Sequence, residues 1–179
     1  MVVMCAKQES RTVRAVSSII CVNSRKKLSE HHSAMFKPSR DQARQLFFET
    51  WRKYRQHEIL SGIETIALEV ILLHPEYHII LDNPERYLTK DYLPENGEIN
   101  PFLHMSMHVA LNEQLSIDQP RGICERFSDL QKMTGDDHIA SHHALECLAE
   151  MIWQAQRNQS APDAAIYLEC LDKRLGSKI

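Results

Sequence analysis

The strongest constraint on the fold is a set of helix-start signals that recurs along the chain. Ser39 with Gln42, and Ser61 with Glu64, have the spacing of a capping box. In this motif two side chains bond backbone N–H groups that the first turn of a helix leaves unpaired. Each motif is followed by a run that suits a helix, so both predict a helix start.

Further helix boundaries follow from single residues. Asn100 is a capping residue followed by Pro101, and proline suits the first turn of a helix. Asp136 places a carboxylate at the positive end of a long helix, and Gly176 suits the end of the last one. We therefore predict an all-α protein, folded as a single bundle of six or seven helices without a convincing strand. The expected helices span about residues 40–56, 62–74, 75–83, 101–115, 122–133, 136–156 and 164–175.

The first 34 residues differ from the rest of the chain. They carry six Lys or Arg against two acids, whereas the whole chain has a net charge of −3, so residues 35–179 carry a net charge of −7. Residues 1–34 show neither helical nor strand periodicity, which predicts a disordered basic leader. A sharper hypothesis is that translation starts at Met35. We expect residues 35–179 to form one helical domain.

Composition argues against several classes of function. The acidic body is unsuited to nucleic acid, because phosphate binding needs basic surface. No apolar run approaches the ~20 residues that span a bilayer. The sequence has no P-loop, GxGxxG, GxSxG or HExxH motif, so we expect neither a nucleotide cofactor, nor a serine hydrolase, nor a zinc-protease helix.

The five cysteines form no CxxC motif and no even framework. This pattern predicts free, mostly buried thiols in an intracellular, cytoplasmic protein. Cys124 and Cys170 fall on apolar helical positions, and so does Trp153, so we expect them in the core. Cys147 follows Glu146, but adjacent helical residues diverge by about 100°, which makes a nucleophile beside His143 a poor interpretation.

The most suggestive chemical pattern is a spacing of four residues between histidines. It occurs three times: His74 with His78, His104 with His108, and His138 with His142. On a helix this spacing puts two side chains on neighbouring turns of one face. Two imidazoles so placed can bind one metal ion, or serve one proton path.

The pair His104 and His108 falls inside the apolar face of its helix, in line with Leu111 and Leu115. Buried imidazoles need partners for their nitrogens, and a metal ion or a carboxylate would provide them.

The long helix has an HxxxE motif, His142 with Glu146, at the border of its apolar face. His138 lies one turn earlier on the same side, and His143 is turned away and expected to be exposed. The HPEYH string is less clear, because His74 ends one predicted helix and His78 lies in the next.

Histidine and carboxylate at helical spacing hold iron, manganese or zinc in helical bundles. We therefore predict a divalent metal site (Fe, Mn or Zn). Its predicted ligands are His74, His78, His104, His108, His142 and Glu146, with Glu69 in reserve. Two alternatives stay open: a non-enzymatic protein-interaction module whose core histidines are simply hydrogen-bonded, and metal-free acid–base catalysis by His142 and Glu146.

From Met35 to about Arg174 the chain also resembles a known family. The strings that carry the likeness are MFKPSRDQ, FFETWRKYR, HPEYH, NPFLHMSMHVALNEQLSIDQP and HHALECLAEMIWQAQR. They are similar to an uncharacterised bacterial family, domain of unknown function 1841. The resemblance implies a bacterial, cytoplasmic protein and a family that starts at the position of Met35. It implies no activity, cofactor or catalytic residue.

Overall fold

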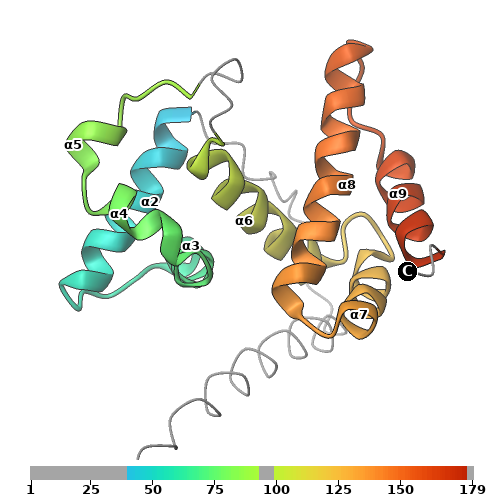
Figure 1. The fold of residues 1–179 in the computed structure, drawn as a ribbon, viewed down its shortest axis with the longest axis horizontal. Helices are drawn as coiled ribbons and strands as arrows, with labels where there is room; N and C mark the ends of the chain where they lie inside the picture. Colours follow the sequence, from blue (N-terminus) through green and yellow to red (C-terminus); the bar gives the residue numbers. More distant parts are fainter. Residues whose placement is uncertain (1–39, 93–98, 177–179) are drawn as a thin grey trace, which may run out of the picture. The chain divides into compact units, whose positions relative to one another are not determined.

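The computed structural model describes residues 40–92 and 99–176, and all regular structure in these two ranges is helical (Figure 1). The all-α prediction is confirmed for this part of the chain. The helices are α2 (Arg40–Arg55), α3 (Gly62–Leu73), the 3-10 helix η1 (Pro75–Tyr77), α4 (His78–Leu81), α5 (Pro84–Tyr87), α6 (Pro101–Ile117), α7 (Ile123–Thr134), α8 (Asp137–Arg157) and α9 (Ala164–Gly176).

The described α-helices number eight, against the six or seven predicted. The short helix α5 lies between the predicted helices 75–83 and 101–115, where the sequence predicted no helix. It begins at Pro84, whose ring suits a first helical turn, and it spans only four residues. A helix of a single turn is too short to show apolar periodicity in the sequence.

The chain divides into two compact units, and the boundary lies inside α6, between Asn112 and Glu113. The two units are described separately below. The predicted leader, residues 1–34, lies outside the described residues, as does Ser39 of the first capping box. A single domain over residues 35–179 stays a prediction.

The first unit is built around one apolar core. Aromatic side chains of α2 meet aliphatic side chains of α3 and the first half of α6. Phe48 and Phe102 bring two of these helices together, with ring centroids 5.3 Å apart. The buried members of this core are Phe47, Phe48, Trp51, Ala67, Val70, Ile71, Leu81, Phe102, Met105 and Val109.

The start of α3 forms as the sequence predicted. The Oε2 atom of Glu64 accepts hydrogen bonds from the backbone N–H of Ser61 (2.7 Å) and from its hydroxyl group (2.8 Å). The other carboxylate oxygen accepts from Lys53 at 2.6 Å, which ties α2 to α3. The Lys53 ammonium and the two bonds from Ser61 lower the pKa of Glu64 to about 2, because each stabilises the charged form.

A buried arginine holds the segment after α5 against α2. Arg44 is almost fully buried and donates hydrogen bonds to the carbonyl groups of Leu88 (2.6 Å) and Lys90 (2.7 Å). Its guanidinium lies over the rings of Tyr92 and Phe102. Burial lowers its pKa, yet five donors on a delocalised cation suit it to bond several carbonyl groups at once.

In the second unit, α7, α8 and α9 pack against one another. The N-cap of α8 is Asp136, whose Oδ1 accepts from the backbone N–H groups of His138 and Ile139, as the sequence predicted. Gly135 precedes it with φ of 69°, a left-handed conformation that glycine adopts without strain. Arg126 joins α7 to α9 through a two-bond ion pair with Asp172.

The predictions for the paired cysteines and for Trp153 are wrong in this unit. Cys147 and Cys170 are joined by a disulfide between α8 and α9, with their Cα atoms 5.5 Å apart, so they are not free thiols. Trp153 is 52% exposed and does not belong to the core. Helical periodicity places a residue on a face of its helix, but it does not show how far along that face the next helix reaches.

Within residues 40–92 and 99–176, no helix is both long enough and apolar enough to cross a membrane.

Candidate functional site

Three histidines gather in the first unit. His74 follows the last turn of α3, and His104 and His108 lie one turn apart on α6. The ring centroids of His74 lie 4.9 Å from His104 and 4.6 Å from His108, and those of His104 and His108 are 4.9 Å apart. His74 and His108 are buried, and His104 is half-buried. We call these three residues the histidine cluster.

The orientation of His74 is fixed by its own helix. Its Nδ1 atom lies 2.8 Å from the carbonyl oxygen of Val70, four residues earlier. A carbonyl oxygen can only accept, so Nδ1 carries a hydrogen. The other ring nitrogen, Nε2, is thereby directed at Nε2 of His104, at a distance of 3.0 Å. In metalloproteins, a backbone carbonyl bonded to one nitrogen of a histidine commonly orients the other nitrogen toward the metal.

Tyr77 forms one wall of the cluster. Its ring stacks on His74, with centroids 5.6 Å apart and planes inclined by 6°, and it meets His104 edge to face. Burial and the nearby Glu76 raise the pKa of the Tyr77 hydroxyl, so it stays protonated. Sequence reasoning did not single out Tyr77, although its place inside HPEYH, three residues after His74, was a usable signal.

His78 has a different environment. Its Nε2 donates to the carbonyl oxygen of Ile71 at 2.9 Å, and its ring packs on Trp51 with centroids 4.4 Å apart. It therefore adds a second hydrogen bond to a carbonyl group at the end of α3 that already accepts from the backbone N–H of His74. His74 follows the end of α3, whereas His78 begins α4. The four-residue spacing therefore crosses a break between helices and does not place the two histidines on one face.

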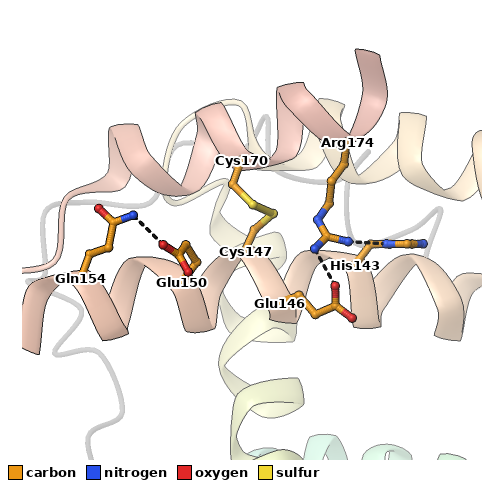
Figure 2. The surroundings of a disulfide bond; sticks show 7 residues. All are labelled: His143, Glu146, Cys147, Glu150, Gln154, Cys170 and Arg174. Carbon is orange, nitrogen blue, oxygen red and sulfur yellow. Dashed lines mark hydrogen bonds and ion pairs between the residues drawn. A yellow bond between two sulfur atoms is a disulfide. The ribbon is translucent and has the colours of Figure 1, made fainter. Parts of the chain in front are cut away.

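The second unit contains the other histidine pair. The rings of His138 and His142 lie 4.4 Å apart, as their spacing on α8 predicts, and they offer ligand atoms within 4.8 Å of each other. Glu146 is exposed, and its carboxylate forms an ion pair with Arg174 of α9 (Figure 2). That His142 and Glu146 act as ligands stays a prediction.

The expectation that His143 is exposed is wrong. It is half-buried, and its Nδ1 accepts a hydrogen bond from Arg174 at 2.7 Å. Glu69, the reserve ligand, is exposed on α3, although desolvation by its neighbours raises the pKa of its carboxyl group.

The distance between the two Nε2 atoms in the histidine cluster suits coordination of one ion. Nitrogens 3.0 Å apart subtend roughly 90–100° at an ion about 2.0–2.1 Å from each. That is close to the cis angle of an octahedral site, whereas a tetrahedral angle needs roughly 3.3–3.4 Å. His74 and His108 also offer ligand atoms within 4.8 Å of each other.

Comparison with protein families gives a match that covers most of the chain. Residues 39–173 match the model of the domain of unknown function (DUF1841). The chain belongs to this family. The matched DUF1841 region includes every residue of the histidine cluster and the disulfide of α8 and α9. No curated protein and no solved structure matches the chain.

Proposed function

We propose that this DUF1841 protein binds a divalent transition-metal ion through His74, His104 and His108. The observation that carries the proposal is the approach of His104 Nε2 to His74 Nε2, at 3.0 Å, while Val70 holds the opposite nitrogen of His74. His108 completes a group of three imidazoles from two helices. Three histidines around one point are a common ligand set for zinc, iron and manganese.

The same geometry indicates how binding would depend on protons. When both rings are neutral, His74 carries its hydrogen on Nδ1, so His104 donates from Nε2 to Nε2 of His74. An ion at this point takes the place of that single hydrogen. His104 then has to move its proton to Nδ1 or release it. Affinity should therefore fall as pH falls, because protons compete for the same nitrogens.

The choice of ion follows from the ligands. Imidazole ligands suit zinc and iron, and manganese becomes suitable when oxygen ligands complete the set. With three protein ligands, an octahedral ion retains positions for water or for a small oxygen ligand. We place this function in the cytoplasm of a bacterial cell, without nucleic acid as a partner, on the basis of the family resemblance and the acidic body.

The test is elemental analysis of protein purified without a metal-affinity tag, followed by titration of metal-depleted protein with Fe²⁺, Mn²⁺ and Zn²⁺. We expect about one ion per chain and a raised melting temperature for the ion that binds. His104→Ala should abolish both effects. A content below about 0.1 ion per chain, with melting unchanged by all three ions, contradicts the proposal.

A matched control separates the cluster from histidine content in general. His57 is exposed in the turn after α2, with φ of 57°, a conformation that asparagine tolerates. His57→Asn should keep the ion and the shift in melting temperature. Equal loss in His57→Asn and His104→Ala would show that the metal is held by surface histidines and not by the cluster.

The alternative, an interaction module, has one observation in its favour. The first unit exposes large aliphatic side chains, with Ile59 94%, Ile79 68% and Leu103 59% exposed. Such side chains commonly mark contact surfaces when they are contiguous. In this alternative the hydrogen bond between His104 and His74 is purely structural. His104→Ala would then lower stability equally in the presence and in the absence of metal ions.

A further inference from the structure

The disulfide of the second unit has two unequal ends. The sulfur of Cys147 is fully buried in the face of α8, among Ala144 and Leu148. Cys170, on α9, is half-buried and lines an open groove. Exchange requires contact with the sulfur under attack, so of the two cysteines Cys170 is the one that we expect an incoming thiolate to reach from the groove.

The groove itself lies between α8 and α9. Its lining carries both signs of charge, with Glu150 and Glu169 acidic and Lys173 and Arg174 basic. Charges of both signs can pair with the carboxylate and ammonium groups of a small zwitterionic molecule. Figure 2 shows the disulfide between two polar groups: Arg174 with Glu146 and His143 on one side, and Gln154 with Glu150 on the other.

Other contacts hold α9 in place besides the disulfide. Tyr167 and Leu171 of α9 are fully buried, and Arg126 of α7 donates two hydrogen bonds to the carboxylate of Asp172. Arg174 also bridges to α8 through Glu146. We expect that breaking the S–S bond leaves these contacts in place, so the unit can keep its fold in both redox states.

We propose that Cys147–Cys170 is a thiol–disulfide exchange site for a low-molecular-mass zwitterionic thiol of the glutathione class, with Cys170 as the sulfur that is attacked. The thiolate of the small molecule bonds to Sγ of Cys170, the S–S bond breaks, and the sulfur of Cys147 leaves with the electron pair and takes a proton. A second small thiol attacks the small-molecule sulfur of this mixed disulfide and releases Cys170. Two thiols are oxidised to one disulfide, and the protein gains two electrons and two protons. The reverse reaction uses the oxidised form of the small thiol.

The proposal is tested on the full chain under native conditions. The protein is incubated with reduced glutathione, alkylated and mapped by mass spectrometry, while circular dichroism follows its helices. We expect alkylation of Cys147 and Cys170 with unchanged helicity, and return of the cross-link on adding oxidised glutathione. Reduction that occurs only together with loss of helical signal overturns the proposal, because the disulfide is then a fixed structural cross-link.

Two single variants identify the attacked sulfur. Cys147→Ser leaves Cys170 in the groove and should accumulate a mixed disulfide with oxidised glutathione. Cys170→Ser leaves only the buried Cys147 of this pair, and the mapped reaction at Cys147 should be at least tenfold slower. Equal rates in the two variants contradict the assignment of Cys170.

If either variant fails to fold, a measurement on the wild-type protein still tests whether exchange occurs in the folded state. Exchange in the native groove gives a reduction rate that does not change with urea below the unfolding transition. A rate that rises steeply with urea in that range shows that unfolding must come first, and it overturns the proposal.

Discussion

The two units of this protein place their chemistry in opposite ways. In the first, residues 40–112, several ionisable side chains are buried: His74 lies beside His108 and Tyr77, and Glu64 is buried at the start of α3. In the second, residues 113–176, α8 and α9 are joined by a covalent bond with ion pairs around it.

The difference concerns what joins helices and segments that are distant in the sequence. In the first unit buried and half-buried side chains do this, since Arg44 bonds the carbonyl groups of Leu88 and Lys90, and His104 meets His74. In the second unit a covalent bond joins α8 to α9, and partly exposed ion pairs join α7 and α8 to α9. Four predictions test this contrast.

The largest effect is expected in the core of the first unit. Phe47 is 1% exposed, so Phe47→Ala should lower the free energy of unfolding by about 3–5 kcal/mol through lost burial and the cavity left behind. Urea denaturation followed by the fluorescence of the buried Trp51, in a Trp153→Phe background, measures it. Ile59→Ala is the matched control, and its effect should stay within about 0.5 kcal/mol because that side chain is exposed.

The second prediction concerns the cross-link. Cys147 and Cys170 are 23 residues apart in sequence, and closing a loop of this length stabilises the folded state by about 3 kcal/mol in the chain-entropy model. The double variant Cys147→Ala, Cys170→Ala should lose that amount while keeping its helical circular dichroism. Loss of the helices themselves would show that the ion pairs and buried side chains of α9 are insufficient to hold it.

The third prediction uses the cap of α3. The pKa of Glu64 lies near 2, below its ordinary value of 4.5, so the folded state binds its carboxylate form more strongly than the unfolded state does. Its contribution is complete above about pH 5 and disappears as pH falls toward 2. Glu64→Gln should cost about 1–3 kcal/mol at pH 7. Denaturation at a series of pH values should show that the difference between variant and wild type shrinks on acidification.

The smallest effect is expected at the ion pair between α7 and α9. Asp172 is about half exposed, so solvent screens its attraction to Arg126. Asp172→Asn should lower the free energy of unfolding by less than about 1 kcal/mol, and added salt should reduce the difference. A loss of several kcal/mol would mean that this long-range pair stabilises the unit as strongly as the core does.

Much of the local structure was predictable from particular residues. Glu64 and Ser61 mark the start of α3, Asn100 caps α6 through the backbone N–H groups of Phe102 and Leu103, and Asp136 caps α8. These signals act within one turn of helix, where the partner is fixed by spacing alone. The same reasoning places His104 with His108, and His138 with His142, on shared faces, as the ring distances confirm.

The site was predictable only in part. Spacing alone suggested that His74 and His78 belong together, but the break before Pro75 sends His78 to Trp51 and leaves His74 with the residues of α6. Apart from two apolar positions on successive helices, no feature of the sequence predicted the bond between Cys147 and Cys170. Their pairing depends on the position of α9 along the axis of α8, and no local sequence signal indicates that position.

The sequence by itself determined the helices, their ends and the faces on which the histidines lie, because capping and helical period act over a few residues. Only the tertiary structure decided which rings meet and which sulfurs bond. Those contacts depend on the packing of one helix against another, where side chains distant in the sequence settle the register.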